Sequence, residues 1–157
     1  MNSEKYKYDF LRYNKYHVLR PNVLLLLALA FLCKDIVLIM VVGAGSFKGG
    51  AGPGMSNLAS LISPKMIVSD LPVIAVVFSL IFRRPEAGRL VRFFWKHGRL
   101  LIALSIVIYI LLVLEQRDFQ FLRLGLLEMA LIGADLLIAA YVFSSRLVKD
   151  IFAEFPT

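Results

Sequence analysis

The chain has 157 residues, of which 59% are hydrophobic, and its mean hydropathy of +0.76 lies outside the range of ordinary soluble domains. Its net charge of +7 would suggest nucleic-acid binding in a soluble protein. Here the basic residues flank apolar runs, so we expect anionic lipid headgroups as partners and no nucleic acid. The single cysteine, Cys33, excludes a disulfide framework and a cysteine-rich metal site.

Residues 22–42 form the first predicted transmembrane span. They follow a polar, basic and Tyr-rich segment, and their length of about twenty residues matches a hydrocarbon core of about 30 Å. A signal peptide is the alternative, because small residues follow the run. The run is longer than the apolar region of a signal peptide and contains Lys34 and Asp35, which favours a retained span.

A Gly-rich segment at residues 43–65 predicts a flexible loop, which the charge count below places in the periplasm. It contains GAGSFKGGAGPG but not the GxxxxGK[ST] pattern of a phosphate-binding loop. Residues 66–82 are the second predicted span, which is short and contains Asp70 and Pro72.

The second half of the chain repeats the alternation of basic and apolar segments. A basic loop at 83–99 precedes the third predicted span at 100–114, and a short connector leads to the fourth at 124–143. The tail has one apolar helical stripe, which we expect to bend onto the membrane or onto a partner. The sequence therefore predicts one all-α membrane domain, residues 1–157, with four transmembrane helices and short amphipathic interfacial segments.

The distribution of Lys and Arg predicts the orientation, because positive charge is retained on the cytoplasmic side. Thirteen of the 18 basic residues fall before the first span, in the 83–99 loop or in the tail. Four fall in the other connections, and Lys34 is the remaining one. We expect a multi-pass protein of the bacterial inner membrane with both termini in the cytoplasm.

Five ionisable residues lie within the predicted spans: Lys34, Asp35, Asp70, Glu128 and Asp135. A charge near the bilayer centre is costly, so each should face protein or water and be paired. Lys34 and Asp135 fall at similar predicted depths, which suggests an ion pair between helices. Lys34 can also reach Glu128, dock another membrane subunit or line an ion path, and Asp70 and Glu128 fit interfacial positions as well.

The cytoplasmic loop contains a basic stripe at helical spacing, formed by Arg89, Arg92, Lys96 and Arg99. Such a helix lies in the interface with its basic face toward anionic headgroups. The alternative is that these charges only determine topology. His17 and His97 have no partner at metal-ligand spacing and no catalytic triad assembles on one side of the membrane, so we expect no enzyme, metal or cofactor.

Three segments carry a family resemblance: YDFLRYNKYHVLRP before the first span, FFWKHGRLLIALS entering the third, and SSRLVKDIFAEFP at the end. Together they resemble the YfeZ-like family of small proteobacterial inner-membrane proteins of unknown function. The resemblance implies a four-helix inner-membrane protein and carries over no activity or site residues.

The pattern favours a non-enzymatic accessory or scaffold subunit that contacts another integral membrane protein or a second copy of itself. Short loops leave little room for a catalytic domain. A small transporter or ion-coupled carrier that uses the intramembrane charges is the alternative, although the sequence has no repeated halves. A lipid-binding protein is the third possibility and depends on the basic loop.

Overall fold

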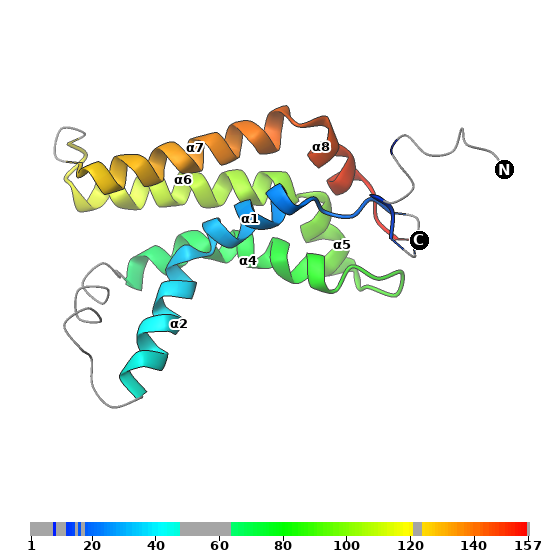
Figure 1. The fold of residues 1–157 in the computed structure, drawn as a ribbon, viewed down its shortest axis with the longest axis horizontal. Helices are drawn as coiled ribbons and strands as arrows, with labels where there is room; N and C mark the ends of the chain where they lie inside the picture. Colours follow the sequence, from blue (N-terminus) through cyan, green and yellow to red (C-terminus); the bar gives the residue numbers. More distant parts are fainter. Residues whose placement is uncertain are drawn as a thin grey trace.

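The computed structural model describes residues 8, 12–14, 16, 18–47, 64–120 and 124–156. Within this part of the chain the fold is all-helical, with seven α-helices, one short 3₁₀ helix and no strand beyond an isolated bridge between Tyr13 and Leu19 (Figure 1). In chain order the elements are α1 Val23–Leu32, α2 Lys34–Phe47, η3 Pro64–Met66, α4 Ile67–Ile81, α5 Arg89–Lys96, α6 Gly98–Gln116, α7 Leu126–Ser144 and α8 Arg146–Ala153.

Helices α6 and α7 are each long and apolar enough to cross a membrane. Both have 19 residues, or about 28 Å at 1.5 Å per residue, close to the thickness of the hydrocarbon core. They run antiparallel and pack against each other (Figure 1). They include the predicted third span and nearly all of the fourth.

The first predicted span is not one helix. Helices α1 and α2 meet at Cys33 with a bend of 64°, and α2 continues through residues 43–47, which were predicted as loop. The rest of that predicted loop, residues 48–63, lies outside the described residues, and residues 64–66 form η3. The sequence did not predict the break between α1 and α2, because no Gly or Pro lies at this point. The bend instead coincides with the two charged residues that follow Cys33.

Helix α4 matches the predicted second span in its limits but not in its length. Its 15 residues reach about 22 Å, which is less than a hydrocarbon core of about 30 Å. The described residues therefore contain two helices that can cross a membrane, or three if the bent α1–α2 pair counts as one span. The predicted count of four is not confirmed.

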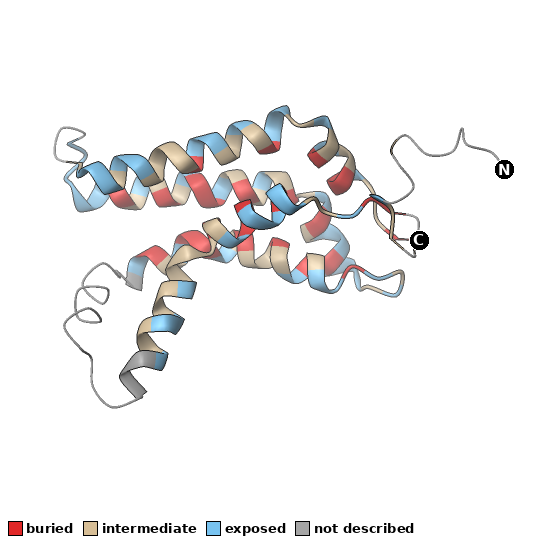
Figure 2. Cartoon of the chain, in the orientation of Figure 1, coloured by how far each residue is buried: buried red, intermediate tan, exposed pale blue. Residues whose placement is uncertain are grey.

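The core lies between the facing sides of α1, α4, α6 and the end of α7. Val73 and Val76 of α4, Ile102 of α6 and Val142 of α7 have no exposed surface. The outward sides are apolar but exposed (Figure 2), as in Leu126 and Leu137 of α7, which are 85% and 74% exposed. An apolar surface of this extent suits a lipid environment.

Helices α5 and α8 close the end of the bundle at which α6 begins and α7 ends (Figure 1). Ser145 separates α8 from α7 and accepts a hydrogen bond from the amide of Val148, which starts the new helix. The apolar stripe of the tail faces inward, because Val148, Ile151 and Phe152 are buried in the same core. The apolar stripe of the tail therefore packs onto its own chain, whereas the sequence pattern had suggested that it packs onto the membrane or onto a partner.

Gly98 allows this close packing at the start of α6. A Cβ atom at this position would overlap the ring of Phe152, which is itself buried. We expect Gly98→Ala to lower the free energy of unfolding by about 1–3 kcal/mol, the usual cost of overpacking. Gly133→Ala is the matched control, because Gly133 also lies within a helix but has open space around it.

The measurement is the thermal midpoint of the purified protein in detergent. We expect Gly133→Ala to leave the midpoint unchanged or to raise it, because alanine favours a helix by about 0.5–1 kcal/mol over glycine. A midpoint for Gly98→Ala at or above that of the wild type would contradict the close contact with Phe152.

Candidate functional site

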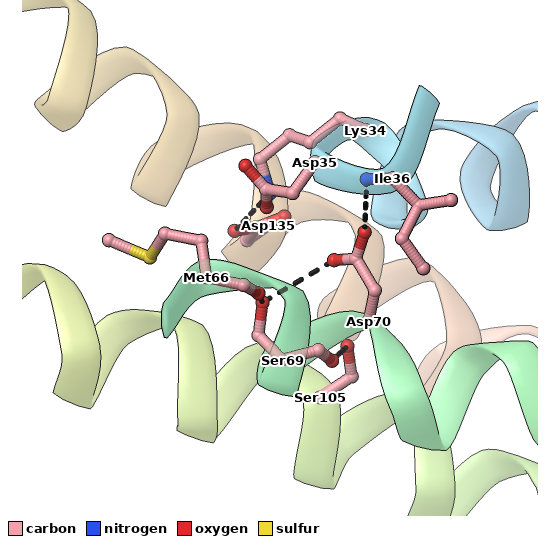
Figure 3. Close-up of polar contacts among 8 residues, drawn as sticks. All are labelled: Lys34, Asp35, Ile36, Met66, Ser69, Asp70, Ser105 and Asp135. Atoms are coloured by element: carbon pink, nitrogen blue, oxygen red, sulfur yellow. Dashed lines mark hydrogen bonds and ion pairs between the residues drawn. The ribbon is translucent and has the colours of Figure 1, made fainter. Parts of the chain in front are cut away.

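The bend between α1 and α2 lies beside a cluster of charged side chains inside the bundle (Figure 3). The polar cluster consists of Lys34 and Asp35 from the start of α2, Asp70 from the first turn of α4, and Asp135 from the middle of α7. Asp70 and Asp135 have no exposed surface. Four of the five intramembrane charges noted in the sequence therefore come together.

Lys34 lies at the centre of the polar cluster. Its ammonium nitrogen is 4.0 Å from Oδ2 of Asp135 and 3.8 Å from Oδ2 of Asp35. It also lies 3.6 Å from the centre of the Tyr109 ring on α6, an arrangement that favours a cation over an aromatic face. One cation thus contacts groups from three helices.

Asp70 caps the broken helix. Its Oδ2 accepts a hydrogen bond of 3.0 Å from the backbone amide of Ile36, which lies in the first turn of α2. The first amides of a helix have no partner within the helix, and an anion placed there also interacts favourably with the helix dipole. Asp70 is therefore a buried group that holds the start of α2 against α4.

Hydroxyl groups connect the polar cluster to the α4–α6 contact. The hydroxyl of Ser69 donates to the carbonyl of Met66 at 2.6 Å and lies 3.4 Å from Oδ1 of Asp70 (Figure 3). The hydroxyl of Ser105 on α6 donates to the carbonyl of Ser69. These bonds hold the first turn of α4, and with it Asp70, against α6.

Asp135 is the least satisfied group of the polar cluster. No hydrogen-bond donor among the described residues reaches either of its carboxyl oxygens, and none reaches Oδ2 of Asp35. The polar cluster contains three carboxyl groups and one ammonium group, which pairs with Asp35 and Asp135, so full ionisation would leave excess negative charge. Such a site is costly for structure alone and can take up a proton.

Glu128 does not join the polar cluster. It accepts a hydrogen bond of 2.6 Å from Arg117 and another of 2.9 Å from the amide of Gly125, at the far end of α7. The Glu128 carboxylate raises the pKa of Arg117 through this hydrogen bond and through its charge. The possible pairing of Lys34 with Glu128 is therefore absent from the structure.

A second polar site, which the sequence analysis missed, joins the two ends of the chain. We call it the terminal cluster and define it as Leu19, Arg83, Trp95, Phe152 and Glu154. Arg83 donates to the carbonyls of Leu19 at 2.9 Å and Glu154 at 2.8 Å, and its guanidinium lies 4.4 Å from the Trp95 ring centre. Burial lowers the pKa of Arg83 to about 10, and the Glu154 carboxylate opposes this shift, so the side chain remains charged at neutral pH.

Trp95 holds the tail against α5 in the terminal cluster. Its indole N–H donates to the carbonyls of Ile151 and Glu154 at 3.2 and 2.9 Å. The Glu154 carboxylate accepts a hydrogen bond of 2.8 Å from the amide of Leu19. The only signal in the sequence is that the single Trp and Arg83 both lie in the basic loop at 83–99.

The predicted basic stripe divides into two kinds of residue. Arg99 donates to the carbonyls of Val142 and Phe143 near the end of α7, and Arg92 donates to the carbonyl of Pro85. Arg89 and Lys96 are exposed. Two of the four side chains therefore have a structural role in addition to any contact with lipid.

Within the described residues, no group of three or more His, Cys, Asp or Glu side chains is placed to hold a metal ion. The polar cluster offers one ammonium and three carboxyl groups. It can pair charges and bind a proton.

Comparison with known proteins agrees with the coarse interpretation. No curated protein and no solved structure matches the chain. The model of one family, described as protein of unknown function (DUF2919), matches residues 8–154. This match includes the terminal cluster and the polar cluster, and it covers nearly the whole chain. The chain belongs to the DUF2919 family.

Proposed function

We propose that this protein is a multi-pass protein of the bacterial inner membrane that acts as a non-enzymatic accessory or scaffold subunit of a membrane complex. Its partner in this proposal is another integral membrane protein or a second copy of the chain. The resemblance to the YfeZ-like family supports the same cellular location. The observation that carries the proposal is the position of α2.

Helix α2 diverges from the bundle after its first turn (Figure 1). It is attached there through the Asp70 cap and the charges around Lys34, whereas Val37, Met40 and Val41 farther along are 48–68% exposed. Because α2 diverges from its own bundle, its exposed apolar side chains are available to a neighbouring helix. The charged attachment sets its direction, so α2 is suited to dock a partner within the membrane.

The proposed topology has α4 as a fourth, short crossing. Helix α4 packs along α6 in the opposite direction (Figure 1), and thinning of the bilayer can accommodate a helix of this length. The described ends of the chain and residues 83–88 lie at the same end of the bundle (Figure 1). This agrees with the excess of basic residues in these segments, which favours the cytoplasm.

Reporter fusions test the topology. We expect a reporter fused after Pro156 to be active in the cytoplasm and one inserted within residues 48–54 to be active in the periplasm. The reason is the thirteen-to-four distribution of basic residues between the two sides. Finding both reporters in one compartment would exclude the proposed arrangement.

Photo-crosslinking tests the scaffold function. We expect a photoreactive residue at Met40 on α2 to crosslink one discrete membrane protein in native membranes. The same residue at Leu137 on α7 is the control, because this position is as exposed as Met40, at 74% against 68%, but lies on the helix that packs along α6. Crosslinks to lipid alone from both positions would reject docking through α2.

A carrier is the second candidate, favoured by the buried carboxyl oxygens of Asp135, which accept no hydrogen bond within the described residues, and by the broken helix beside them. Broken helices and buried charges near the membrane centre are typical of transporters, although these usually occur in repeated pairs. This function requires proton or solute flux in proteoliposomes that Asp135→Asn abolishes. Flux equal to that of empty liposomes would leave the scaffold function as the better account.

A further inference from the structure

We propose that the basic pocket between α5, α6 and α8 binds the phosphodiester headgroup of an anionic phospholipid as a discrete site. The pocket has a volume of about 470 Å³ and lies where α6 begins and α8 follows α7. The inference is independent of the scaffold function and requires only that α6 and α7 cross the membrane.

Four cationic side chains line the pocket: Arg92 and Lys96 from α5, Arg99 from α6 and Lys149 from α8. No carboxylate is among the lining residues. The two arginines are positioned by hydrogen bonds to backbone carbonyls, so they are held in place before a ligand binds. Lys96 and Lys149 are exposed and have no ion pair within the described residues. The lining therefore selects an anion and leaves two ammonium groups available to bind it.

The rest of the lining distinguishes a lipid from a free anion. Trp95, Phe152, Ala153 and Phe155 also line the pocket; Trp95 and Phe152 are almost fully buried, Phe155 is partly exposed, and Arg92 lies 5.3 Å from the Phe155 ring centre. Inorganic phosphate gains nothing from apolar lining residues, whereas the glycerol and first acyl carbons of a phospholipid can pack against them. The pocket also lies at the ends of the spanning helices, at the level of the headgroups, where basic pockets bind anionic lipid.

The structure also separates this site from a diffuse basic surface. Arg89 belongs to the same predicted stripe on α5, and Arg146 lies on α8, but neither lines the pocket and both are exposed. A general attraction to anionic membranes would use these arginines as much as the two lysines. A discrete site would depend on Lys96 and Lys149.

The sole tryptophan of the chain, Trp95, reports on occupancy because it lines the pocket. The full-length protein, purified in detergent and depleted of lipid, is titrated with short-chain phosphatidylglycerol while its fluorescence is recorded. Phosphatidylcholine and inorganic phosphate are titrated separately, and native mass spectrometry counts bound lipid. We expect saturable binding of one phosphatidylglycerol, with phosphatidylcholine at least about tenfold weaker.

Two double variants, each of which removes one positive charge from α5 and one from α8, test whether binding depends on the pocket. We expect Lys96→Gln with Lys149→Gln to weaken phosphatidylglycerol binding about 10- to 30-fold, and Arg89→Gln with Arg146→Gln to weaken it by less than about threefold. Unchanged elution and thermal midpoints show that both variants are folded. An equal loss in both variants, or equal binding of phosphatidylcholine, would overturn the discrete site. Saturation by inorganic phosphate that prevents lipid binding would assign the pocket to free phosphate and overturn the lipid assignment.

Discussion

Replacing Trp95 with alanine is expected to lower the free energy of unfolding by about 3–5 kcal/mol, because it empties a fully buried site of its largest side chain. The change also removes the indole N–H that holds the carbonyls of Ile151 and Glu154, and the ring against which Arg83 and Phe152 pack. The thermal midpoint in detergent measures the loss. Limited proteolysis should show faster cleavage of the C-terminal tail, which Trp95 holds.

Two controls separate packing from hydrogen bonding at this site. Trp95→Phe keeps most of the ring and loses the N–H, so we expect a cost of about 1 kcal/mol. Phe93→Ala removes an aromatic ring from the same helix at a position that is 55% exposed, and should change stability by less than about 0.5 kcal/mol. If Phe93→Ala lowered the thermal midpoint as much as Trp95→Ala, the packing of Trp95 in the terminal cluster would not explain the stability of this end of the bundle.

Replacing Lys34 with methionine is expected to cost about 3–5 kcal/mol, because three carboxyl groups then share the buried space without a cation. Asp135→Leu should cost less. Lys34 keeps Asp35 and the Tyr109 ring as partners, and the carboxyl group that is removed has no hydrogen-bond donor. Only the structure predicts that Lys34→Met costs more than Asp135→Leu. The sequence gives the predicted depth of each residue in the membrane, and by depth alone the two partners are equivalent.

The double variant of Lys34→Met with Asp135→Leu should be more stable than Lys34→Met alone, but it should not reach the wild type. Asp35 and Asp70 still lack a cation in this variant. The coupling between the two changes, measured from thermal midpoints and denaturant unfolding in detergent, reports the ion pair directly. If the two single effects add, Lys34 and Asp135 do not interact in the folded protein.

An exposed ion pair of the same type provides the matched control. Lys65 and Glu115 lie 3.4 Å apart with side chains that are 69% and 54% exposed. Solvent screens such a pair, and we expect its coupling to be below about 1 kcal/mol. A coupling at Lys34 and Asp135 no larger than this would mean that burial adds nothing to their interaction.

The sequence by itself determined the all-helical class, the two long spans and the limits of α4, because hydropathy over about twenty residues reports directly on how a segment partitions into lipid. It also identified Lys34 and Asp135 as a possible pair. Depth along two helices follows from counting residues at a constant rise, and a buried charge requires a partner.

Only the tertiary structure decided where the first span breaks and which polar groups meet. The bend at Cys33 depends on the hydrogen bond that Asp70 of α4 accepts from the amide of Ile36. These two residues lie more than thirty positions apart, so a local sequence pattern cannot predict the bend. From the sequence, Arg83 and Trp95 are only two residues of the basic loop at 83–99. Their partners, Leu19 and Glu154, come from opposite ends of the chain. Hydropathy records the preference of each residue for lipid or water, whereas these contacts depend on which helix faces which, and packing alone determines that.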